Sequence, residues 1–453
     1  MEKRRPSTKI LERSINEVIF QLKCFHLSMS QFFKKTIQTT LVIFGCTFLV
    51  QSCAKKKDVV AEEPSPATPV SPTNPAIGGL PVERNPANAN YSPAFAGQTR
   101  IAGVTTATRI RSTVLTSSLT APWGIAALTE GRFLITEKAG RMRIVSGGGA
   151  VGEAITGIPQ VNSNGQGGLL GLCLDPGFNT NRMVYWSFSE PGTGGNRTSI
   201  AKGRLADNER SIEGATVIYR SSPAYPGVNH YGGRVIFDAA GNLFVSTGER
   251  ADNATRAQAQ STTASIGKII RITKDGQPAA GNPYTGQSGA LPELYSIGHR
   301  NPQGLAIHPV TGELWQSEHG PRGGDEINRV QAGANYGWPI ITYGLEYSGQ
   351  QVLTGIQQRD GMTQPVYYWD PVVSPSGITF YSSDRIQEWR NNLFIGALSG
   401  MHIIRLVIEN NTVIGEERLL TTESQRFRDI TQGIDGALYA ITDQGRLYKI
   451  DRD

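Results

Sequence analysis

A short segment that recurs six times is the feature that most restricts how this chain folds. Each copy has a turn residue, then alternating apolar residues, then small polar ones. Each is too short to form a core of its own, so neighbouring copies must stack. The copies begin at Gly131, Asn181, Gly241, Gly312, Asn391 and Gly436, with spacings of 50, 60, 71, 79 and 45 residues. The pattern predicts an all-β chain, a six-bladed β-propeller with four-stranded blades.

The short last interval suggests how such a ring closes. We expect the final blade to take one strand from residues near 100–115, which protects the edge that an open ring would expose. A β-sandwich is the alternative architecture for so many short strands. In a propeller, loops from every blade converge on one end of the central channel, so we expect a loop-built site at this axial mouth.

The positive charge of the chain is concentrated at its N-terminus. The formal net charge is +6, but residues 1–52 hold eight Lys/Arg against three Asp/Glu, which leaves 36 basic and 35 acidic residues elsewhere. The basic balance therefore belongs to the first 52 residues and gives no support to nucleic-acid binding.

The same 52 residues have the pattern of an export signal. Lys34 and Lys35 precede an apolar stretch, residues 41–50, that is too short to span a bilayer. The sequence V-Q-S-C ending at Cys53 resembles a bacterial lipobox, which implies cleavage before Cys53 and a lipid anchor on its thiol. We therefore expect a bacterial lipoprotein exported to the periplasmic side of a membrane or to the cell surface. An uncleaved membrane anchor is the alternative.

Composition divides the remaining chain in two. Residues 53–95 are rich in Pro, Ala, Thr, Asn and Glu with almost no aromatics, which predicts a flexible tether. Residues 96–453 hold the repeats and are expected to form the propeller. Cys173 is the cysteine that remains after the leader and the lipidated position, so no intramolecular disulfide is expected.

The densest cluster of polar residues lies between Tyr295 and Pro339. It includes three of the six histidines and the acidic pair Asp325–Glu326. Backbone carbonyls at the Gly320–Pro321 turn and these carboxylates are hard oxygen ligands that suit Ca²⁺, whereas no His/Cys spacing typical of zinc occurs. The three histidines are expected to be structural: His299, His308 and His319.

Further candidates for binding or catalysis lie outside this cluster. His230 precedes a strand and could act as a general base, although a lone histidine is more often structural. Gln166, in a glycine-rich loop, either extends its amide into the channel or belongs to an ordinary turn. Arg426 and Arg428 are two apart on an extended segment, so they point the same way and suit a carboxylate ligand. The alternative is a solvated strand end with Asp429 as their partner.

Six motifs, taken together, resemble those of the glucose/sorbosone dehydrogenase family. They are G-Q-G-G-L-L-G, N-H-Y-G-G-R, G-H-R-N-P-Q-G-L, S-E-H-G-P-R-G-G-D-E-I-N, N-Y-G-W-P and Q-R-F-R-D. The likeness covers about residues 115–450 and points in particular to the bacterial soluble aldose sugar dehydrogenases. It implies a six-bladed propeller that binds pyrroloquinoline quinone (PQQ) and Ca²⁺.

The resemblance also implies a role for each matching residue. His230 matches the base that takes the proton from the sugar C1 hydroxyl, while a hydride passes to the quinone. Gln166 matches a residue beside quinone and substrate, and Arg300 and Asn301 match a pair that contacts the cofactor, with Arg300 near the carbonyl that becomes negative. The remaining matches are ligands: Gly320 and Pro321 for the cofactor-bound Ca²⁺, Glu326 and the Tyr336 carbonyl for a second, structural Ca²⁺, and Arg426 and Arg428 for the PQQ carboxylates.

Two positions depart from the family pattern. Asn229 stands before the base where glucose-type enzymes carry an acid, as in the aldose-type branch. Ser399 occupies a cofactor-facing position where the family usually has a lysine. PQQ is a tricarboxylate, so the loss of one cation is expected to weaken its binding by about 1–3 kcal/mol.

These observations lead to one main hypothesis and two alternatives. The main hypothesis is a PQQ-dependent dehydrogenase that oxidises aldose sugars at C1 to the lactone and passes the electrons to an acceptor that the sequence does not identify. One alternative is a Ca²⁺-dependent propeller hydrolase that acts on lactones or sugar esters. The other is a non-catalytic lipoprotein that binds glycans at the cell surface.

Overall fold

The computed structural model describes residues 79–453 of the chain. The predicted leader, the lipobox with Cys53 and the first part of the predicted tether lie outside the described residues. Within residues 79–453, no helix combines the length and the apolar character needed to cross a bilayer.

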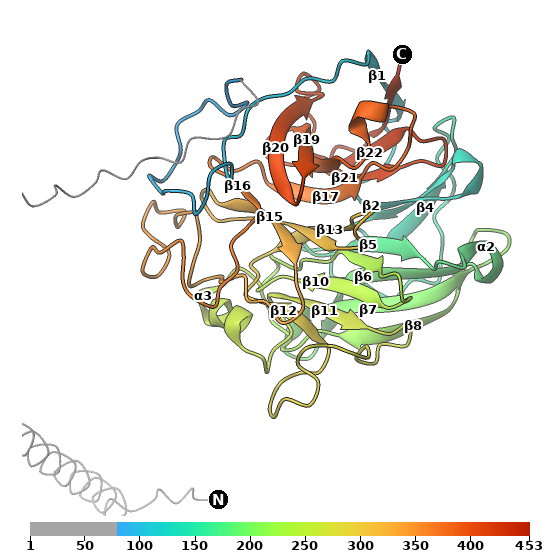
Figure 1. The fold of residues 1–453 in the computed structure, drawn as a ribbon. Coiled ribbons are helices and arrows are strands. Elements are labelled where there is room, and N and C mark those ends of the chain that lie inside the picture. Colours follow the sequence, from blue (N-terminus) through green and yellow to red (C-terminus); the bar gives the residue numbers. More distant parts are fainter. Residues whose placement is uncertain (1–78) are drawn as a thin grey trace, which may run out of the picture. The chain divides into compact units, whose positions relative to one another are not determined.

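The described residues form six antiparallel sheets arranged as blades in a ring, which confirms the predicted six-bladed β-propeller (Figure 1). In blades 1–5 the strands pair with their sequence neighbours, so each of these blades is a meander; blade 6 adds β1, from near the start of the described chain, to a meander of three strands. Blade 1 comprises β2 (Pro122–Ala127), β3 (Phe133–Glu137) and β4 (Arg141–Val145). Blade 2 comprises β5 (Leu169–Leu174), β6 (Met183–Gly192), β7 (Gly195–Leu205) and β8 (Ile212–Arg220). Blade 3 comprises β9 (Val235–Phe237), β10 (Leu243–Thr247), β11 (Lys268–Ile272) and β12 (Leu294–Ile297).

Blade 1 has three strands, one fewer than predicted, and the other blades have four. Helical segments are short and lie in connections: η1 (Thr129–Gly131), α2 (Phe178–Asn181), α3 (Asn253–Arg256), η2 (Ala257–Gln260) and η3 (Gln387–Trp389). Blade 4 comprises β13 (Pro302–Ile307), β14 (Leu314–Glu318), β15 (Asp325–Val330) and β16 (Tyr367–Trp369). Blade 5 comprises β17 (Pro375–Phe380), β18 (Leu393–Ala397), β19 (His402–Glu409) and β20 (Thr412–Leu419). Blade 6 comprises β21 (Phe427–Gln432), β22 (Leu438–Thr442), β23 (Leu447–Arg452) and β1 (Ile110–Thr116).

The six repeat copies fall on the second strand of each blade. These strands are β3, β6, β10, β14, β18 and β22. In β3, β10, β14, β18 and β22 every residue is buried, because a second strand has a partner on each side and a neighbouring blade over each face. A strand buried on both faces needs a nearly continuous apolar sequence. This is why the copies are recognisable in the sequence.

The ring closes through β1, as the short last interval predicted. This strand pairs antiparallel with β23, with Ile110 opposite Arg452 and Val114 opposite Tyr448. It lies at the outer edge of blade 6, beside the C-terminus (Figure 1). Its alternation of exposed and half-buried residues fits an edge strand.

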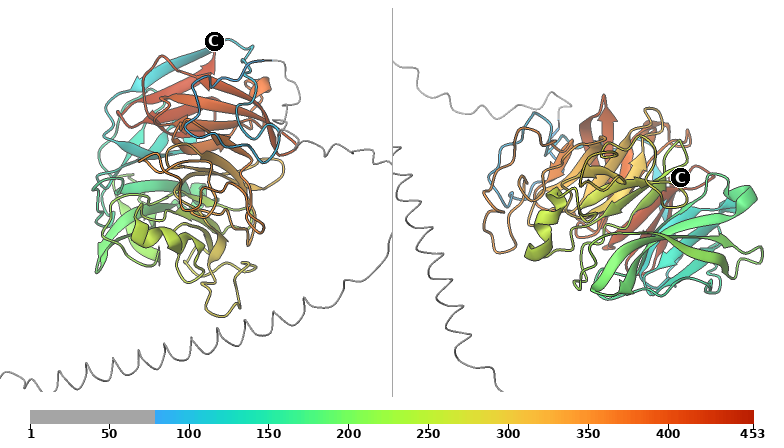
Figure 2. Two further views of the ribbon diagram at one scale, coloured as in Figure 1. Left: turned by 90° about the vertical axis from the view of Figure 1, so that its left-hand side faces the viewer. Right: turned by 90° about the horizontal axis from the view of Figure 1, so that it is seen from below.

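Residues 79–95, which the sequence assigned to the tether, contact the propeller. Glu83 forms an ion pair with Arg418 of β20 at 3.0 Å. The backbone and side-chain amides of Asn88 donate hydrogen bonds to the Asp370 carboxylate at 3.0 and 2.6 Å. This blue segment runs alongside the orange and red strands of blades 4 and 5 in two directions of view (Figures 1 and 2).

The hydrophobic core is divided among the junctions between neighbouring blades. Trp315 and Tyr367 of blade 4, for example, pack with Ile378, Leu393 and Ile404 of blade 5. Comparable clusters fill the other junctions, including the one between blade 6 and blade 1. Each blade is therefore held by both neighbours, and the inner strands are fixed around the axis.

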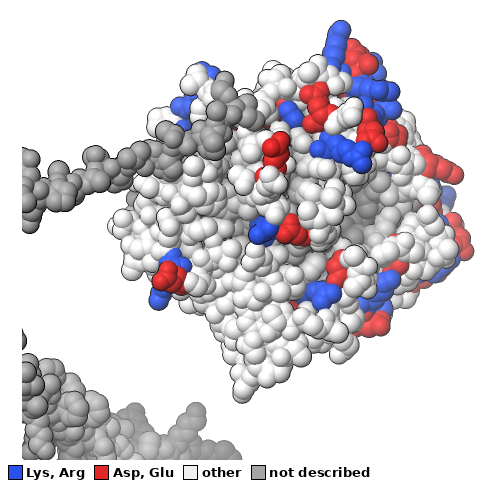
Figure 3. Space-filling model, in the orientation of Figure 1, with Lys and Arg blue, Asp and Glu red and all other residues white. Residues whose placement is uncertain are grey.

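Acidic and basic side chains are interspersed on the surface. On the face shown in Figure 3, blue and red side chains lie next to one another, and no continuous basic field covers it. Many charged side chains of residues 79–453 are paired, such as Arg204 with Glu213 at 2.9 Å and Arg220 with Glu190 at 2.8 Å.

Candidate active site

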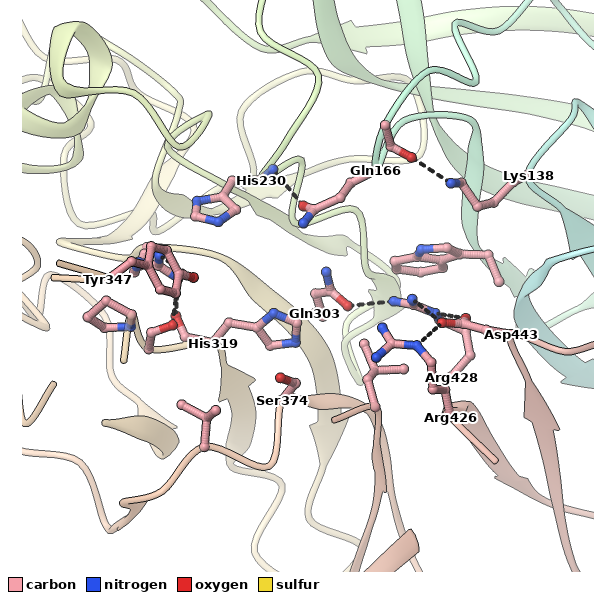
Figure 4. Close-up of a pocket in the computed structure, with 17 residues that line it drawn as sticks. Lys138, Gln166, His230, Gln303, His319, Tyr347, Ser374, Arg426, Arg428 and Asp443 are labelled. Carbon is pink, nitrogen blue, oxygen red and sulfur yellow. Dashed lines mark hydrogen bonds and ion pairs between the residues drawn. The ribbon is translucent and has the colours of Figure 1, made fainter. Parts of the chain in front are cut away.

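A cavity of about 450 Å³ lies at one end of the propeller channel. Most of its lining residues lie near the start of an innermost strand or just beyond the end of a second strand. Both positions are at the same mouth because neighbouring strands are antiparallel, and Figure 4 shows the side chains that line the cavity there. The lining residues are Trp123, Lys138, Gly165, Gln166, His230, Arg300, Gln303, His319, Gly320, Pro321, Tyr347, Val372, Ser374, Leu398, Arg426, Arg428 and Asp443.

Seven of the residues proposed from the sequence line this one cavity. They come from blades 2, 3, 4 and 6 and are Gln166, His230, Arg300, Gly320, Pro321, Arg426 and Arg428. Asn301 lies behind them, where its Oδ1 accepts a hydrogen bond from the Gly232 amide at 3.1 Å. Its Nδ2 is buried without a hydrogen-bond partner among the described residues.

His230 is held by two contacts in the turn before β9. Its Nδ1 lies 2.6 Å from Oε1 of Glu249, which follows β10. Its backbone amide donates to Oε1 of Gln166 at 2.8 Å. The φ angle of His230 is 46°, a left-handed conformation that few non-glycine residues adopt. These contacts fix the ring at the cavity wall.

Burial shifts the pKa values of both members of the His230–Glu249 pair. Burial raises the pKa of Glu249 to about 7. Burial, together with the nearby Arg300 and Arg250, lowers the pKa of His230 well below its usual value, so the imidazole is neutral. When Glu249 is ionised, it accepts a hydrogen bond from Nδ1–H of His230, so the ring proton stays on Nδ1 and Nε2 is free to accept a proton.

Arg300 connects the cavity to the loop after β14. Its Nη1 donates to the carbonyl oxygens of Gly320 at 2.7 Å and His319 at 3.1 Å. The guanidinium lies over the ring of Trp338, 5.1 Å from its centroid. Its Nε is buried and has no hydrogen-bond partner within residues 79–453. The side chain is thus held by carbonyls and a π face, and it keeps its positive charge available.

Arg426 and Arg428 both point into the cavity, and both bind Asp443. The Nε atoms lie 2.9 and 2.8 Å from the Asp443 oxygens. Although burial acts to raise it, the pKa of Asp443 lies below its usual value because of the two arginines. Asp429, the partner considered from the sequence, instead pairs with Arg234 at 2.6 Å. That alternative is therefore wrong: Asp429 is buried, and its carboxylate binds Arg234, which precedes β9, and the amide of Ile125 in β2.

A second, much smaller cavity lies beneath the loop after β14. Its volume is about 10 Å³, close to the size of one small ion or water. Glu326 and Tyr336 line it, as does Glu318. Burial and the neighbouring Glu318 raise the pKa of Glu326 to about 8. Two carboxylates that share a buried space are costly unless a cation lies between them.

Asp325 organises the loops around this region rather than lining the large cavity. Its Oδ1 accepts from the Gly320 amide at 2.8 Å, and its Oδ2 accepts from the Val373 and Ser374 amides at 2.7 and 2.6 Å. It therefore joins the Gly320–Pro321 turn of blade 4 to the loop that enters blade 5. No cluster of three or more His, Cys, Asp or Glu side chains suited to a metal occurs in the described part of the chain.

Ser399 lies at the rim of the cavity. Its side chain is exposed, and its Oγ is 2.8 Å from that of Ser374, which lines the cavity. The neighbours of Ser399 in the chain, Leu398 and Gly400, are uncharged as well. The absence of a lysine here therefore removes a charge from the mouth of the cavity.

Several cavity residues were not singled out from the sequence. His319 was expected to be structural, but it lines the cavity. The others are Trp123, Lys138, Gln303, Tyr347 and Asp443, with Glu249 behind His230. One signal was available: four of the six repeat copies end in an acid that is either the last residue of the buried strand or lies one or two residues beyond it. These acids are Glu137, Glu249, Glu318 and Asp443, and each binds a polar or basic group.

Comparison with known proteins agrees with the fold. Residues 119–449 match the family described as Glucose / Sorbosone dehydrogenase. The aldose sugar dehydrogenase YliI of Escherichia coli (strain K12) is 40% identical over 342 residues, which cover 74% of this chain and 91% of that protein.

Solved structures give the same result. The soluble aldose sugar dehydrogenase of Escherichia coli, crystallised in the apo-form, has a TM-score of 0.73 at 38% identity and covers 76% of this chain and 100% of its own. The PQQ-bound form of the aldose sugar dehydrogenase of Streptomyces coelicolor has a TM-score of 0.62 at 27% identity and covers 77% of this chain and 99% of its own.

The fold and these matches define the class of the protein, a β-propeller sugar dehydrogenase. The chain belongs to the glucose/sorbosone dehydrogenase family, whose match spans all six blades.

Proposed function

We propose that the protein is a PQQ-dependent dehydrogenase that oxidises aldose sugars at C1 to the lactone. One observation carries the proposal: a single cavity combines a neutral imidazole, held by a carboxylate, with a strong excess of positive charge. The imidazole suits proton abstraction, and the positive charge suits a small polyanion. The relatives named for aldose sugar oxidation and for bound PQQ support the assignment.

The residues present fit PQQ, a planar tricarboxylate. The cavity volume of about 450 Å³ is within the usual range for small-molecule sites. Lys138, Arg300, Arg426 and Arg428 line it, against the single carboxylate of Asp443 in the described chain. Arg300 also has a buried Nε–H that lacks a partner. A polyanion would offset this charge and complete these hydrogen bonds.

His230 is the proposed base. Glu249 holds the proton on Nδ1 and orients the ring, so Nε2 accepts the proton of the sugar C1 hydroxyl as the carbon is oxidised. PQQ, when bound, supplies the oxidant by accepting the hydride from C1, so that the sugar loses two electrons and becomes the lactone. Glu249 also stabilises the imidazolium formed by this transfer, because it lies 2.6 Å from Nδ1.

We propose that Arg300 and the Gly320–Pro321 turn stabilise negative charge on the cofactor. The Gly320 carbonyl already accepts a hydrogen bond from Arg300, and Asp325 fixes the Gly320 amide from below. We propose that the Gly320 and Pro321 carbonyls would hold the cofactor-bound Ca²⁺. A carbonyl oxygen has two lone pairs, so Gly320 has room for both Arg300 and a cation.

The small cavity is the proposed site of a second, structural Ca²⁺. Glu326 and the Tyr336 carbonyl would be ligands, and Glu318 adds a carboxylate that the sequence did not suggest. Carboxylate and carbonyl oxygens are the donors that Ca²⁺ prefers.

The test begins with purified apo-protein and an artificial electron-accepting dye. We expect dye reduction with aldoses only when PQQ and Ca²⁺ are both added, and loss of most of it in His230→Ala. His308→Ala is the matched control, because His308 follows β13 at the opposite end of the blade and contacts Phe380. Activity unchanged in His230→Ala would remove the base assignment.

The same experiment separates the other hypotheses. Hydrolysis of lactones without any quinone would indicate the propeller hydrolase. Glycan binding without PQQ binding or turnover would indicate the non-catalytic lipoprotein. Either result would overturn the dehydrogenase proposal.

We also propose that the protein is exported and held at a membrane by a lipid on Cys53. The proposal rests on the sequence before and at Cys53. In a bacterial host, the wild-type chain should be recovered with membranes, and Cys53→Ala should be released from them or retained as an uncleaved precursor. Unchanged membrane recovery of a processed Cys53→Ala chain would contradict lipid anchoring.

A further inference from the structure

The cationic side chains of the cavity differ in whether a neighbouring carboxylate neutralises their charge. Arg426 and Arg428 share the carboxylate of Asp443, so these three groups together contribute one net positive charge. Arg300 and Lys138 are bound to backbone carbonyls rather than to carboxylates within the described chain. Their charges are therefore available to an anionic ligand.

Lys138 is held rigidly on the blade 1 side of the cavity. It directly follows β3; its amide donates to the Ala121 carbonyl at 3.1 Å, and its own carbonyl accepts from the Leu169 amide at 3.0 Å. A Cβ at Gly168 would lie 2.3 Å from this carbonyl, so the close approach requires glycine there. The backbone from which the lysine extends is thus fixed by blades 1 and 2.

The ammonium group of Lys138 lies beside the glycine-rich loop that carries Gln166. Its Nζ donates to the Gly165 carbonyl at 2.7 Å (Figure 4). An ammonium has three donors, so two remain after this bond. Burial lowers the pKa of Lys138, and repulsion by the nearby Arg428 lowers it further. A bound anion would relieve that repulsion.

We propose that Lys138 binds a carboxylate of PQQ and supplies the cation that this chain lacks at Ser399. The inference rests on the proposed function. Ser399 and Lys138 belong to different blades, yet Ser399 contacts Ser374, which lines the same cavity as Lys138. Electrostatic attraction to a trianion depends on total charge near it, so a lysine from another wall can replace one at the rim.

The test measures PQQ binding by the full-length apo-protein in the presence of Ca²⁺, by the change in PQQ absorbance or by quenching of tryptophan fluorescence. Three variants are compared with wild type: Lys138→Gln, Lys138→Arg and the double variant Lys138→Gln/Ser399→Lys. Circular dichroism and Tm show whether each is folded.

We expect Lys138→Gln to raise the Kd for PQQ tenfold or more, the size of a lost charged hydrogen bond. The Kd of Lys138→Arg should stay near that of wild type. Addition of Ser399→Lys to the Lys138→Gln variant should restore its PQQ binding. The KM for the sugar at saturating PQQ should not change in Lys138→Gln.

Different failures have different meanings. If wild-type protein does not bind PQQ, the proposed function fails. If wild type binds PQQ and Lys138→Gln binds it equally well, the proposed role of Lys138 is overturned. It is also overturned if Lys138→Arg loses as much as Lys138→Gln, if Ser399→Lys restores nothing, or if only the sugar KM changes.

Discussion

Glu249 gives the sharpest test of the catalytic geometry, through the substitution Glu249→Gln. The carboxylate lies 2.6 Å from Nδ1 of His230 and is almost fully buried. In the proposed mechanism, the substitution removes the charge that stabilises the imidazolium. A charged hydrogen bond is worth about 1.5–3 kcal/mol, and 1.36 kcal/mol corresponds to tenfold in rate. We therefore expect kcat/KM to fall by roughly 10- to 100-fold.

The pH dependence adds a second readout. Because burial raises the pKa of Glu249 to about 7, the carboxylate gains a proton as the pH falls through this value. A protonated Glu249 donates to Nδ1, which places the ring's own proton on Nε2 and prevents it from acting as a base. In wild type, kcat/KM should thus rise with pH through about 7, and Glu249→Gln should lack this limb.

The assay is dye reduction with an aldose at saturating PQQ and Ca²⁺, measured from pH 5 to about 9. Glu190→Gln is the matched control, since Glu190 lies at the corresponding end of β6 and pairs with Arg220 away from the cavity. The Kd for PQQ should be unchanged in both variants. Wild-type kcat/KM and an unchanged acidic limb in Glu249→Gln would refute the reasoning.

Three further predictions concern stability. Glu326→Gln should raise the Tm of the apo-protein, because it removes one of two buried carboxylates that share a cavity. It should also abolish the rise in Tm that Ca²⁺ gives the wild-type protein, and an undiminished effect of Ca²⁺ in a calorimetric scan would contradict the second Ca²⁺ site. Trp315→Ala should destabilise the fold by about 3–5 kcal/mol in urea unfolding, because Trp315 fills the junction between blades 4 and 5; a loss below about 1 kcal/mol would mean that the junction is not tightly packed. A chain that begins after Thr116 lacks β1 and leaves β23 as an open edge, so it should aggregate on light scattering; a monomer with wild-type Tm would show that β1 is dispensable.

The match between repeat and blade shows why this fold could be predicted. The copies are strands buried on both faces, and burial on both faces forces a continuous apolar run that survives in the sequence. Outer strands carry no such pattern: β1 alternates between exposed and half-buried residues, and only the short last interval pointed to it. The missing fourth strand of blade 1 had no signal at all.

The candidate site was predicted in part. His230, Arg300, Gly320 and Arg428 lie in motifs whose residue types suit their chemistry, and the structure brings them to one cavity. Glu249 and Asp443 escaped because an acid after a strand is an ordinary strand end in sequence. Only the arrangement of the innermost and second strands around the axis shows that the ends of the second strands, where Glu249 and Asp443 lie, face the cavity.

The sequence by itself determined the number of blades, the closing strand and the motifs that carry the chemistry, since each depends on local patterns of apolar and turn residues. The tertiary structure decided the charge partners. Asp429 pairs with Arg234, which is 195 residues away in the sequence. Lys138 of blade 1 and Arg428 of blade 6, the two blades that meet where the ring closes, line the same cavity. Such pairs follow from the closing of the ring around one axis, and no local pattern encodes which side chains will meet there.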